Sequence, residues 1–241
     1  EDPSIVVTPM SSKKFVGGAG IVAAHAAGLG AKVDFFSITG QDISRDFASE
    51  KLKDFSVNAY LEIDETRPTT LKQRYRAKNK TLLRVSHLHQ NSINLELQKK
   101  LLAEVQSRIS EYDLMVFSDF NYGCLPQTLV DNLTQIASIN NVLMVADSQS
   151  SSQSGDVTRF KGMDILTPTE HEARVSLHNQ EDGLVTLAEN IRIKSSAKNI
   201  MLKLAEEGVL LHQTVDSLKS GTDRIKSFNL NPADEAGAGD S

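Results

Sequence analysis

The chain has 241 residues, 39% hydrophobic and 24% charged, and its 26 Lys and Arg against 31 Asp and Glu give a net charge of −5. This composition excludes a disordered chain, and a single Cys excludes an internal disulfide scaffold. The mild acidity argues against a nucleic-acid partner, and neither a secretory leader nor a membrane-spanning run of roughly 20 apolar residues is visible. One large domain and a cytoplasmic location are therefore expected.

Short apolar runs alternate with amphipathic stretches along most of the chain. In chain order, the pattern predicts a strand at 33–38, a helix at 93–109, a strand at 114–117, a helix starting with Pro126 and ending at 139, a strand at 142–146, a strand at 164–166, a helix at 181–193, and strands at 200–204 and 209–212. Strands that alternate with helices favour an α/β fold with a mostly parallel, doubly wound sheet.

Residues 58–89 break this alternation. They are rich in Thr, Tyr, Val and charged residues and show no helical period, which predicts extended hairpins outside the main sheet, as a lid over its edge. Cations recur at every second position, and on one strand they would share one face: Lys72, Arg74, Arg76, Lys78 and Lys80. Such a face can hold the phosphate of a sugar phosphate, or it can protect an edge strand from aggregation.

Polar residues follow several predicted strands, at the sheet edge where ligands of open α/β sheets bind. They are Asp119, Asp147, Thr169, Glu172 and Lys203. Each alone is typical of a turn or a helix cap. Together they predict a polar crevice that can hold a metal ion.

The strongest local pattern is Gly237-Ala238-Gly239-Asp240, three residues after Asp234. Small residues let the backbone approach a ligand, and successive N–H groups can form an anion-binding concavity. Asp240 can accept a proton from a substrate hydroxyl, a combination that suits phosphoryl transfer. The alternative is a Gly-rich surface loop.

On these residues the sequence resembles the ribokinase/PfkB family of carbohydrate kinases. The family signature D-x-x-G-A-G-D matches 234–240, its Gly-Gly signature matches Gly17-Gly18, its G-x-D segment matches 40–42, and its T-P-N-x-x-E motif resembles 167–172. Residues 68–74, 82–85 and 117–123 are similar to segments of the heptose-7-phosphate kinase branch. The resemblance implies one ribokinase-like domain over 1–241, truncated at both ends relative to the family, with a small β-lid at about 1–16 and 58–91.

The resemblance also implies ATP-dependent phosphorylation of a sugar or sugar-phosphate hydroxyl, with heptose 7-phosphate becoming the 1,7-bisphosphate, and a possible homodimer through the lid. It implies that Asp240 is the general base and that the backbone N–H groups of Gly237, Ala238 and Gly239 contact the transferring phosphoryl group. Glu172 would help to place Mg²⁺, and the nucleotide residues would be Asp147, Thr169, Lys203 and Asp234. The sugar residues would be Gly17, Gly18, Lys72, Arg74, Arg76 and Asp119.

Two other interpretations stay open. Ile21 and Thr169 stand where the family has Asn, which favours a degenerate kinase fold with a binding or regulatory role. The run Gly18-Ala19-Gly20-Ile21-Val22-Ala23 fits a dinucleotide-binding fingerprint, which would indicate an oxidoreductase. Against this, residues 13–16 make a poor buried strand, and no acidic residue ends the next strand.

Overall fold

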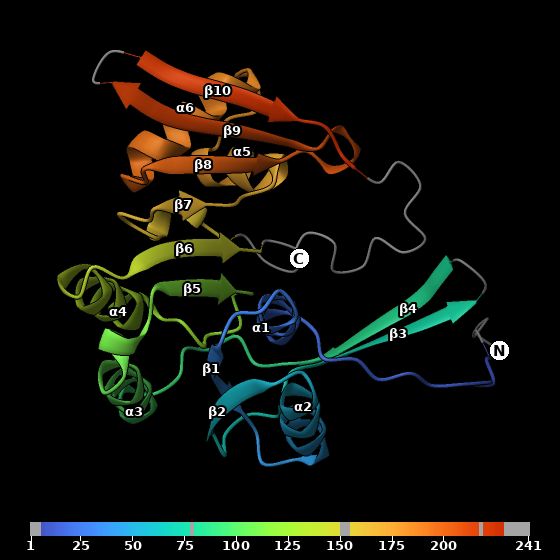
Figure 1. The fold of residues 1–241 in the computed structure, drawn as a ribbon. Coiled ribbons are helices and arrows are strands. Elements are labelled where there is room, and N and C mark those ends of the chain that lie inside the picture. The colour runs from blue at the N-terminus through green and yellow to red at the C-terminus, as the bar shows by residue number, and fades with distance from the viewer. Residues whose placement is uncertain (1–5, 78–79, 150–154, 217–218, 229–241) are drawn as a thin grey trace.

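The computed structural model describes residues 6–77, 80–149, 155–216 and 219–228 (Figure 1). Its α-helices are α1 (Ala19–Gly28), α2 (Ile43–Asp54), α3 (Leu95–Gln106), α4 (Gln127–Ile139), α5 (Glu170–Leu177) and α6 (Leu184–Ser195). Its strands are β1 (Val33–Thr39), β2 (Val57–Ile63), β3 (Leu71–Ala77), β4 (Lys80–His87), β5 (Leu114–Asp119), β6 (Leu143–Ser148), β7 (Ile165–Leu166), β8 (Asn199–Lys203), β9 (Val209–Asp216) and β10 (Lys219–Ile225). Short 3₁₀ turns lie at Ile109–Glu111, Val157–Arg159 and Ala205–Glu207.

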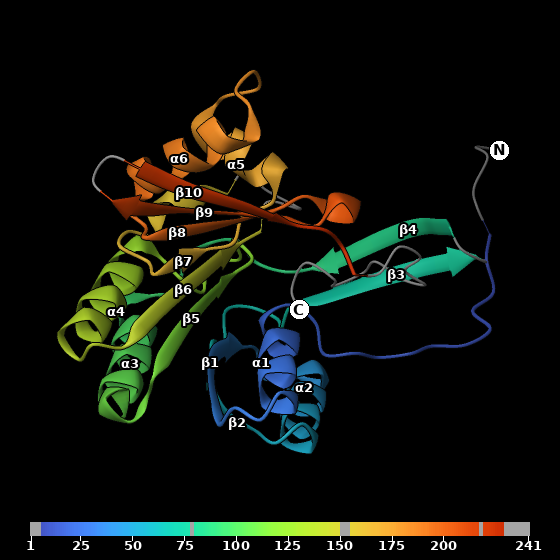
Figure 2. The same cartoon turned by 45° about the horizontal axis from the view of Figure 1, so that its top comes forward.

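The main sheet has six strands in the order β10-β9-β8-β7-β6-β5. Strands β5 to β8 pair in parallel, while β9 and β10 are antiparallel additions at one edge. The prediction of a mostly parallel α/β fold is confirmed, and each predicted strand from residue 114 onward lies in this sheet. Figure 2 shows α3 and α4 on one side of β5 and α1 on its other side.

Alternate residues along the main-sheet strands have very different surroundings. Phe117 is 3% exposed and Ala146 and Leu202 are 0% exposed, and all three belong to the core that helices α3 to α6 build on this face. Leu114 and Leu143 alternate with them and are 47% and 55% exposed. Because successive side chains of a strand point to opposite faces, the covered face carries the core and the other face is open.

Local signals explain where the helices begin. Asn94 caps α3 by accepting a hydrogen bond from the Leu97 N–H, and Pro126 occupies the N-cap of α4. The predicted helix at 93–109 therefore starts two residues late, and it ends at Gln106 before a 3₁₀ turn. The helix predicted at 181–193 starts at Leu184, directly after the N-cap Gly183.

Strand β2 corrects the prediction that residues 58–89 form only hairpins. It pairs in parallel with β1 in a separate two-stranded sheet, and α2 makes the crossover between the two strands. The buried Val57 packs with Ala23 of α1 and Leu52 of α2 in a second small core. Burial of one end of β2 against two helices decides which strand it pairs with. The polar composition of β2 gave no sign of this pairing. Strands β3 and β4 do form the predicted antiparallel hairpin, which projects from the body in Figure 1.

Residues 6–17 form neither helix nor strand. The dinucleotide fingerprint at Gly18 needs a buried strand directly before it, and that strand is missing from the described residues that precede α1. None of the helices in the described part of the chain combines the length and apolarity that crossing a bilayer requires.

Candidate active site

Asp147 and Lys203 meet at the carboxyl end of the main sheet. Asp147 lies near the end of β6 and Lys203 at the end of β8, and the Lys203 Nζ is 2.9 Å from the Asp147 Oδ1. The Thr167 hydroxyl donates a hydrogen bond of 3.0 Å to the same oxygen. Asp147 and Lys203, both predicted to bind the nucleotide, are therefore in direct contact although they lie 56 positions apart in the sequence.

Burial raises the pKa of the Asp147 carboxyl, and the Lys203 ammonium only partly opposes that shift. Glu172 lies near enough to add to the rise through charge repulsion. A buried acid whose pKa is raised, beside a specific cation at the ligand-binding edge of a sheet, is typical of a functional site.

Thr169 and Glu172 form a capping box at the start of α5. The Glu172 carboxylate accepts a hydrogen bond from the Thr169 N–H at 2.8 Å, and the Glu172 N–H donates to the Thr169 hydroxyl at 3.2 Å. Thr169 also forms an isolated parallel bridge with Lys203. The N-terminus of α5 thus opens beside the Asp147–Lys203 pair, and the N–H groups of a helix start favour phosphate.

The described residues contain no group of three or more His, Cys, Asp or Glu side chains that could hold a metal ion alone. Asp147 and Glu172 fit the usual mode of Mg²⁺ binding, in which one or two carboxylates act together with the phosphates of a nucleotide.

Asp119, predicted as a sugar ligand, ends β5 and is held by hydrogen bonds on both carboxylate oxygens. Its Oδ2 accepts a hydrogen bond of 2.8 Å from the Arg159 guanidinium, and its Oδ1 accepts one from the Asn121 N–H. The same Arg159 nitrogen donates to the Leu125 carbonyl at 3.0 Å. Asp119 and Arg159 together fix the loop that follows β5. Sequence reasoning missed Arg159, and its only signal was an Arg in a loop far along the chain.

The Gly17-Gly18 turn lies against the loop after β5. A Cβ at Gly18, whose φ is +55°, would meet the Phe120 ring at 3.2 Å, whereas a Cβ at Gly17 would find no atom within 4 Å. Gly18 is thus required by the close approach of an aromatic ring. Gly17 faces open space in which a ligand can approach the backbone.

Lys72 connects the hairpin to this loop. Its Nζ lies 4.9 Å from the centroid of the Tyr122 ring and 6.0 Å from that of Phe120. The two rings form a stacked pair, with centroids 6.4 Å apart and planes inclined by 24°. Gly18, Phe120, Tyr122 and Lys72 therefore gather at one place, although the sequence indicated only the Gly-Gly turn and Lys72.

The register of the hairpin defines its two faces. Arg74 lies opposite Arg84, and a bulge at Leu82 shifts the pairing so that Arg76 lies opposite Thr81. Directly opposed residues share a face, so the cationic face carries Lys72, Arg74, Arg76 and Arg84. The opposite, apolar face carries Leu71, Tyr75, Leu83 and Val85. Because Lys72 contacts Tyr122, the cationic face is the one turned toward the body.

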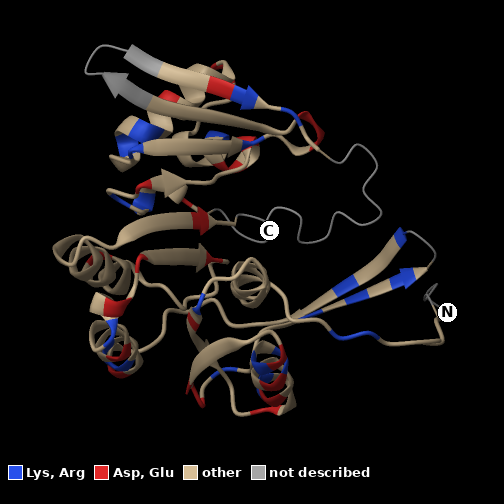
Figure 3. Cartoon of the chain, viewed as in Figure 1, with Lys and Arg blue, Asp and Glu red and all other residues tan. Residues whose placement is uncertain are grey.

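The prediction that all five cations share one face is wrong for Lys80. The chain reverses after Ala77, and Lys80 opens β4 opposite Ala77, on the apolar face. Lys78 lies outside the described residues. Every charged residue in β3 and β4 is nevertheless Lys or Arg, as the blue bands in Figure 3 show.

Hydrogen bonds hold the base of the hairpin on the body. The Thr69 N–H donates to the Asp42 carboxylate at 2.8 Å, and the Thr69 hydroxyl accepts from the Gly40 N–H at 3.0 Å. Burial raises the Asp42 pKa, but hydrogen bonds from Thr69 and from the backbone N–H groups of Arg45 and Ser44 outweigh burial and lower it overall. Arg67 completes the anchor by donating to the carbonyls of Tyr122 and Asn91. These anchors fix the direction in which the hairpin projects.

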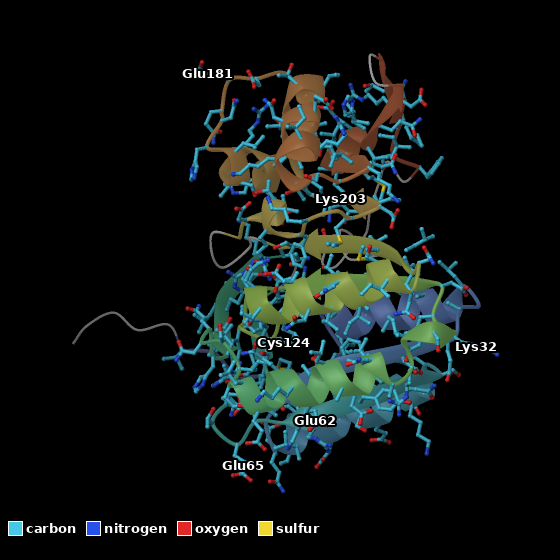
Figure 4. The ribbon with its side chains drawn as sticks, turned by 90° about the vertical axis from the view of Figure 1, so that its left-hand side faces the viewer. Lys32, Glu62, Glu65, Cys124, Glu181 and Lys203 are labelled. Atoms are coloured by element: carbon cyan, nitrogen blue, oxygen red, sulfur yellow. The ribbon has the colours of Figure 1, made fainter. Side chains whose placement is uncertain are left out.

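The predicted catalytic residues Gly237, Ala238, Gly239 and Asp240, together with Asp234, lie outside the described residues. The described part of the site has two regions. In Figure 4, Lys203 marks the region beside β8, and Cys124, one residue after Gly123, marks the loop that follows β5.

The fold defines the chain as a ribokinase-like α/β protein. Ribokinase from Giardia lamblia superposes with a TM-score of 0.71 at 20% identity, covering 97% of this chain and 75% of that one. Phosphofructokinase-2 from Escherichia coli, solved with substrates and products, gives a TM-score of 0.67 at 18% identity, covering 93% and 71%. At such identities the likeness concerns the fold alone.

The chain belongs to the pfkB family of carbohydrate kinases, whose family model matches residues 2–241. The bifunctional protein HldE of Helicobacter pylori (strain ATCC 700392 / 26695) is 29% identical over 213 residues, which cover 87% of this chain and 45% of that protein. The chain thus spans about half the length of the curated relatives it matches. The family resemblance predicted from the motifs is confirmed, and the oxidoreductase interpretation is wrong.

Proposed function

We propose that the chain transfers the γ-phosphoryl group of ATP to a hydroxyl of a phosphorylated sugar, with heptose 7-phosphate giving the 1,7-bisphosphate. Family membership supports a carbohydrate kinase. The observation that supports a phosphorylated substrate is the cationic face of the hairpin. Lys72 on this face contacts the Tyr122 ring, in the loop that lies against the Gly17-Gly18 turn.

A neutral sugar needs no such face. The two strands carry no Asp or Glu, whereas the chain as a whole has a net charge of −5. A local excess of Lys and Arg attracts an anionic substrate and can bind its phosphate through charge-assisted hydrogen bonds. Lys72, Arg74 and Arg76 are the proposed phosphate ligands. Protection of an edge strand explains the exposed Lys80, which lies on the other face.

Nucleotide binding is assigned to the second region of the site. Lys203 would meet the ATP phosphates, and the N-terminus of α5 at Thr169 would add backbone N–H groups. Asp147 and Glu172 would hold a Mg²⁺ ion together with the nucleotide, and the bound ion would neutralise charge on the phosphates. Asp234 is a further candidate for the nucleotide pocket.

In the proposed reaction, a substrate hydroxyl oxygen attacks the γ-phosphorus of ATP as the bond to the β,γ-bridging oxygen breaks and ADP leaves. Asp240 accepts the hydroxyl proton. The backbone N–H groups of Gly237, Ala238 and Gly239 stabilise the charge that develops on the transferring group. These four assignments rest on the sequence motif and the family.

A degenerate kinase fold with a binding or regulatory role is the second candidate. Ile21 favours it, because an apolar side chain cannot provide the hydrogen bond expected at this position. Thr169 favours it less, because its hydroxyl caps α5 as an Asn side chain also would.

We also propose a homodimer through the hairpin. Its apolar face exposes Leu71, Tyr75 and Leu83, at 38%, 37% and 56%. An exposed apolar face of a two-stranded hairpin favours packing against another copy of the chain. Sedimentation should give a dimer, and Leu83→Lys on this face should shift it toward monomer.

The test of the kinase assignment is ATP consumption with Mg²⁺ across free sugars, sugar phosphates and nucleosides. Turnover on heptose 7-phosphate is expected, and Asp240→Asn should abolish it while ATP binding, measured by calorimetry, persists. Turnover confined to unphosphorylated sugars would refute the role of the hairpin. Folded protein without turnover on any acceptor would favour the regulatory candidate.

A further inference from the structure

We infer that Arg67 is a positioning residue for the sugar phosphate, because its guanidinium joins both ends of the hairpin to the loop after β5 and so sets the position of the cationic face. The inference rests on the proposed function, in which that face binds the phosphate of the substrate. Arg67 lies outside both strands of the hairpin and acts through the residues that it holds.

The hairpin is attached to the body at one end. The chain enters β3 and leaves β4 through two connections, residues 64–70 and residues 88–94, and Figure 2 shows both strands projecting beyond them. A small rotation at the connections therefore moves Arg74 and Arg76 further than Lys72, which lies near the base of the hairpin. The position of the cationic face depends on how firmly the two connections are held.

One guanidinium ties these connections together. The Arg67 Nε donates a hydrogen bond of 2.7 Å to the Asp64 carboxylate, within the first connection. Its Nη2 donates to the Asn91 carbonyl, in the second connection, at 2.9 Å. Its Nη1 donates to the Tyr122 carbonyl, in the loop after β5, at 3.2 Å. Each nitrogen of the guanidinium thus binds a different residue, and together they bridge both connections and the body.

The ion pair at this joint is buried and held on all sides. The side chains of Arg67 and Asp64 are 9% and 4% exposed. The Asp64 carboxylate also accepts hydrogen bonds from the Thr66 N–H at 3.0 Å and the Thr66 hydroxyl at 2.6 Å, while the Asp64 N–H donates to the Thr39 carbonyl at the end of β1. Because a guanidinium presents its donors in a rigid planar fork, these contacts together specify one position of the Arg67 side chain.

Two glycines let the backbone of the body touch the connections directly. A Cβ at Gly40, just after β1, would meet the Arg67 carbonyl oxygen at 2.5 Å. A Cβ at Gly123, whose φ is +75°, would overlap the Asn91 carbonyl oxygen, the same atom that accepts from the Arg67 Nη2. The Gly123 carbonyl accepts a hydrogen bond of 3.0 Å from the Ile93 N–H. Arg67 therefore links the two points at which the connections press on the body.

Lysine cannot make the same joint. Its ammonium can pair with Asp64, but a single point charge cannot reproduce the fork that also reaches the carbonyls of Tyr122 and Asn91. Without those two bonds the hairpin would spend part of its time away from the binding position, and the affinity for the sugar phosphate falls with the fraction that is in place. The affinity for ATP should not follow, because its phosphates are assigned to Lys203 and the N-terminus of α5.

The experiment compares Arg67→Lys with the parent in the full-length protein, by steady-state kinetics and by calorimetric binding of heptose 7-phosphate. Arg108→Lys is the matched control. Arg108 also binds a carboxylate and a backbone carbonyl, both of Glu104, but it follows α3 and lies outside the proposed site.

Arg67→Lys is expected to raise KM for heptose 7-phosphate about fivefold, with KM for ATP changed by less than about twofold. Arg108→Lys should change neither value. Arg67→Met should weaken sugar-phosphate binding at least as much and should also lower the Tm, because it leaves the buried Asp64 carboxylate without its cation.

A second background separates positioning from a general loss of structure. It replaces the three proposed phosphate ligands Lys72, Arg74 and Arg76 by Gln. Since Arg67 acts through these residues, Arg67→Lys should lose most of its effect on KM for the sugar phosphate in this background.

Three results would overturn the positioning role. They are an unchanged KM for heptose 7-phosphate in Arg67→Lys, an equal rise of both KM values with a lowered Tm, and an undiminished rise in the Gln background. Failure of the kinase proposal looks different: the parent binds heptose 7-phosphate and Arg67→Lys weakens that binding, but no acceptor is phosphorylated. A parent protein that binds no sugar phosphate would remove the phosphate-binding face and this inference with it.

Discussion

Asp119 and Asp147 end neighbouring strands of the main sheet, yet the structure uses them in opposite ways. Asp119 lies opposite Ser148, whereas Asp147 lies opposite Ser118, so the two acids are offset by one residue. A one-residue offset turns side chains to opposite faces of a sheet. Asp119 shares the covered face with Phe117 and is 4% exposed, whereas Asp147 points to the open face.

The partners of the two acids follow from these faces. On the covered face, Asp119 meets Arg159 from the 3₁₀ turn Val157–Arg159, and the pair locks a loop. On the open face, Asp147 meets Lys203, and burial raises its pKa. The same residue type at the same sheet edge thus pairs with an Arg that locks a loop on one face and with Lys203 of the proposed nucleotide site on the other.

The largest expected effect comes from breaking the structural pair. Arg159→Met leaves the Asp119 carboxylate buried without its cation, which should cost roughly 3–5 kcal/mol of unfolding free energy. Denaturant unfolding measures this loss. The double variant with Asp119→Asn removes the orphaned charge and should recover part of it. A loss below about 1 kcal/mol in the single variant would mean that the pair does not hold the loop.

Breaking the second pair should affect ligand binding more than stability. In Lys203→Met the Asp147 carboxyl, whose pKa is already raised, can take up a proton instead of staying charged. We expect KM for ATP to rise about tenfold or more, with a smaller loss of unfolding free energy than in Arg159→Met. Equal destabilisation by both variants, with ATP affinity intact, would contradict the distinction between the two faces.

Much of this edge could be predicted from the sequence, because its signals are local. Apolar runs mark the strands of the main sheet, and parallel strands bring the residues at their carboxyl ends together. That reasoning predicts Asp147, Thr169 and Lys203 as neighbours, and the structure has them in contact. It also predicts Asp119 at the same edge.

The remainder depends on contacts between residues far apart in the chain. Which face Asp119 points to depends on the strand register, and Arg159 is 40 residues away. The pairing of β2 with β1 depends on burial of Val57 by two helices. The aromatic neighbours of Lys72 depend on how the base of the hairpin is anchored to the body. The periodicity of the sequence does not predict this anchoring.

Titration offers a sharper comparison, because a third acid has the opposite pKa shift. Two hydrogen bonds from Arg192 and one from the buried His212 lower the pKa of Glu189 from 4.5 to about 2. A lowered pKa gives stability that is complete above pH 4.5 and is lost as the pH falls toward 2. For Asp147 the sign is reversed, since its raised pKa makes the charged form a cost that protonation relieves.

Glu189→Gln should therefore destabilise the chain by about 1 kcal/mol at pH 7, allowing for solvent screening of a side chain that is one third exposed. The difference from the parent chain should shrink as the pH is lowered from 4.5 to 3. Denaturant midpoints across this range measure it. A difference that stays constant with pH would show that Glu189 acts by packing rather than by charge.

The smallest expected effect concerns the turn that follows Lys203. Ala205 has a φ of +52°, in the left-handed region that costs a residue with a Cβ roughly 1 kcal/mol. Ala205→Gly removes this strain but gives the unfolded chain more freedom, so the net gain should be a few tenths of a kcal/mol up to about 1 kcal/mol. The same change at the exposed helical Ala103 of α3 should instead cost about 1 kcal/mol. Opposite signs in thermal unfolding would show that the backbone beside Lys203 is strained, as expected if the structure holds Lys203 in place for the proposed contact with the nucleotide. Equal losses at both positions would place the strain elsewhere and leave Lys203 on an ordinary turn.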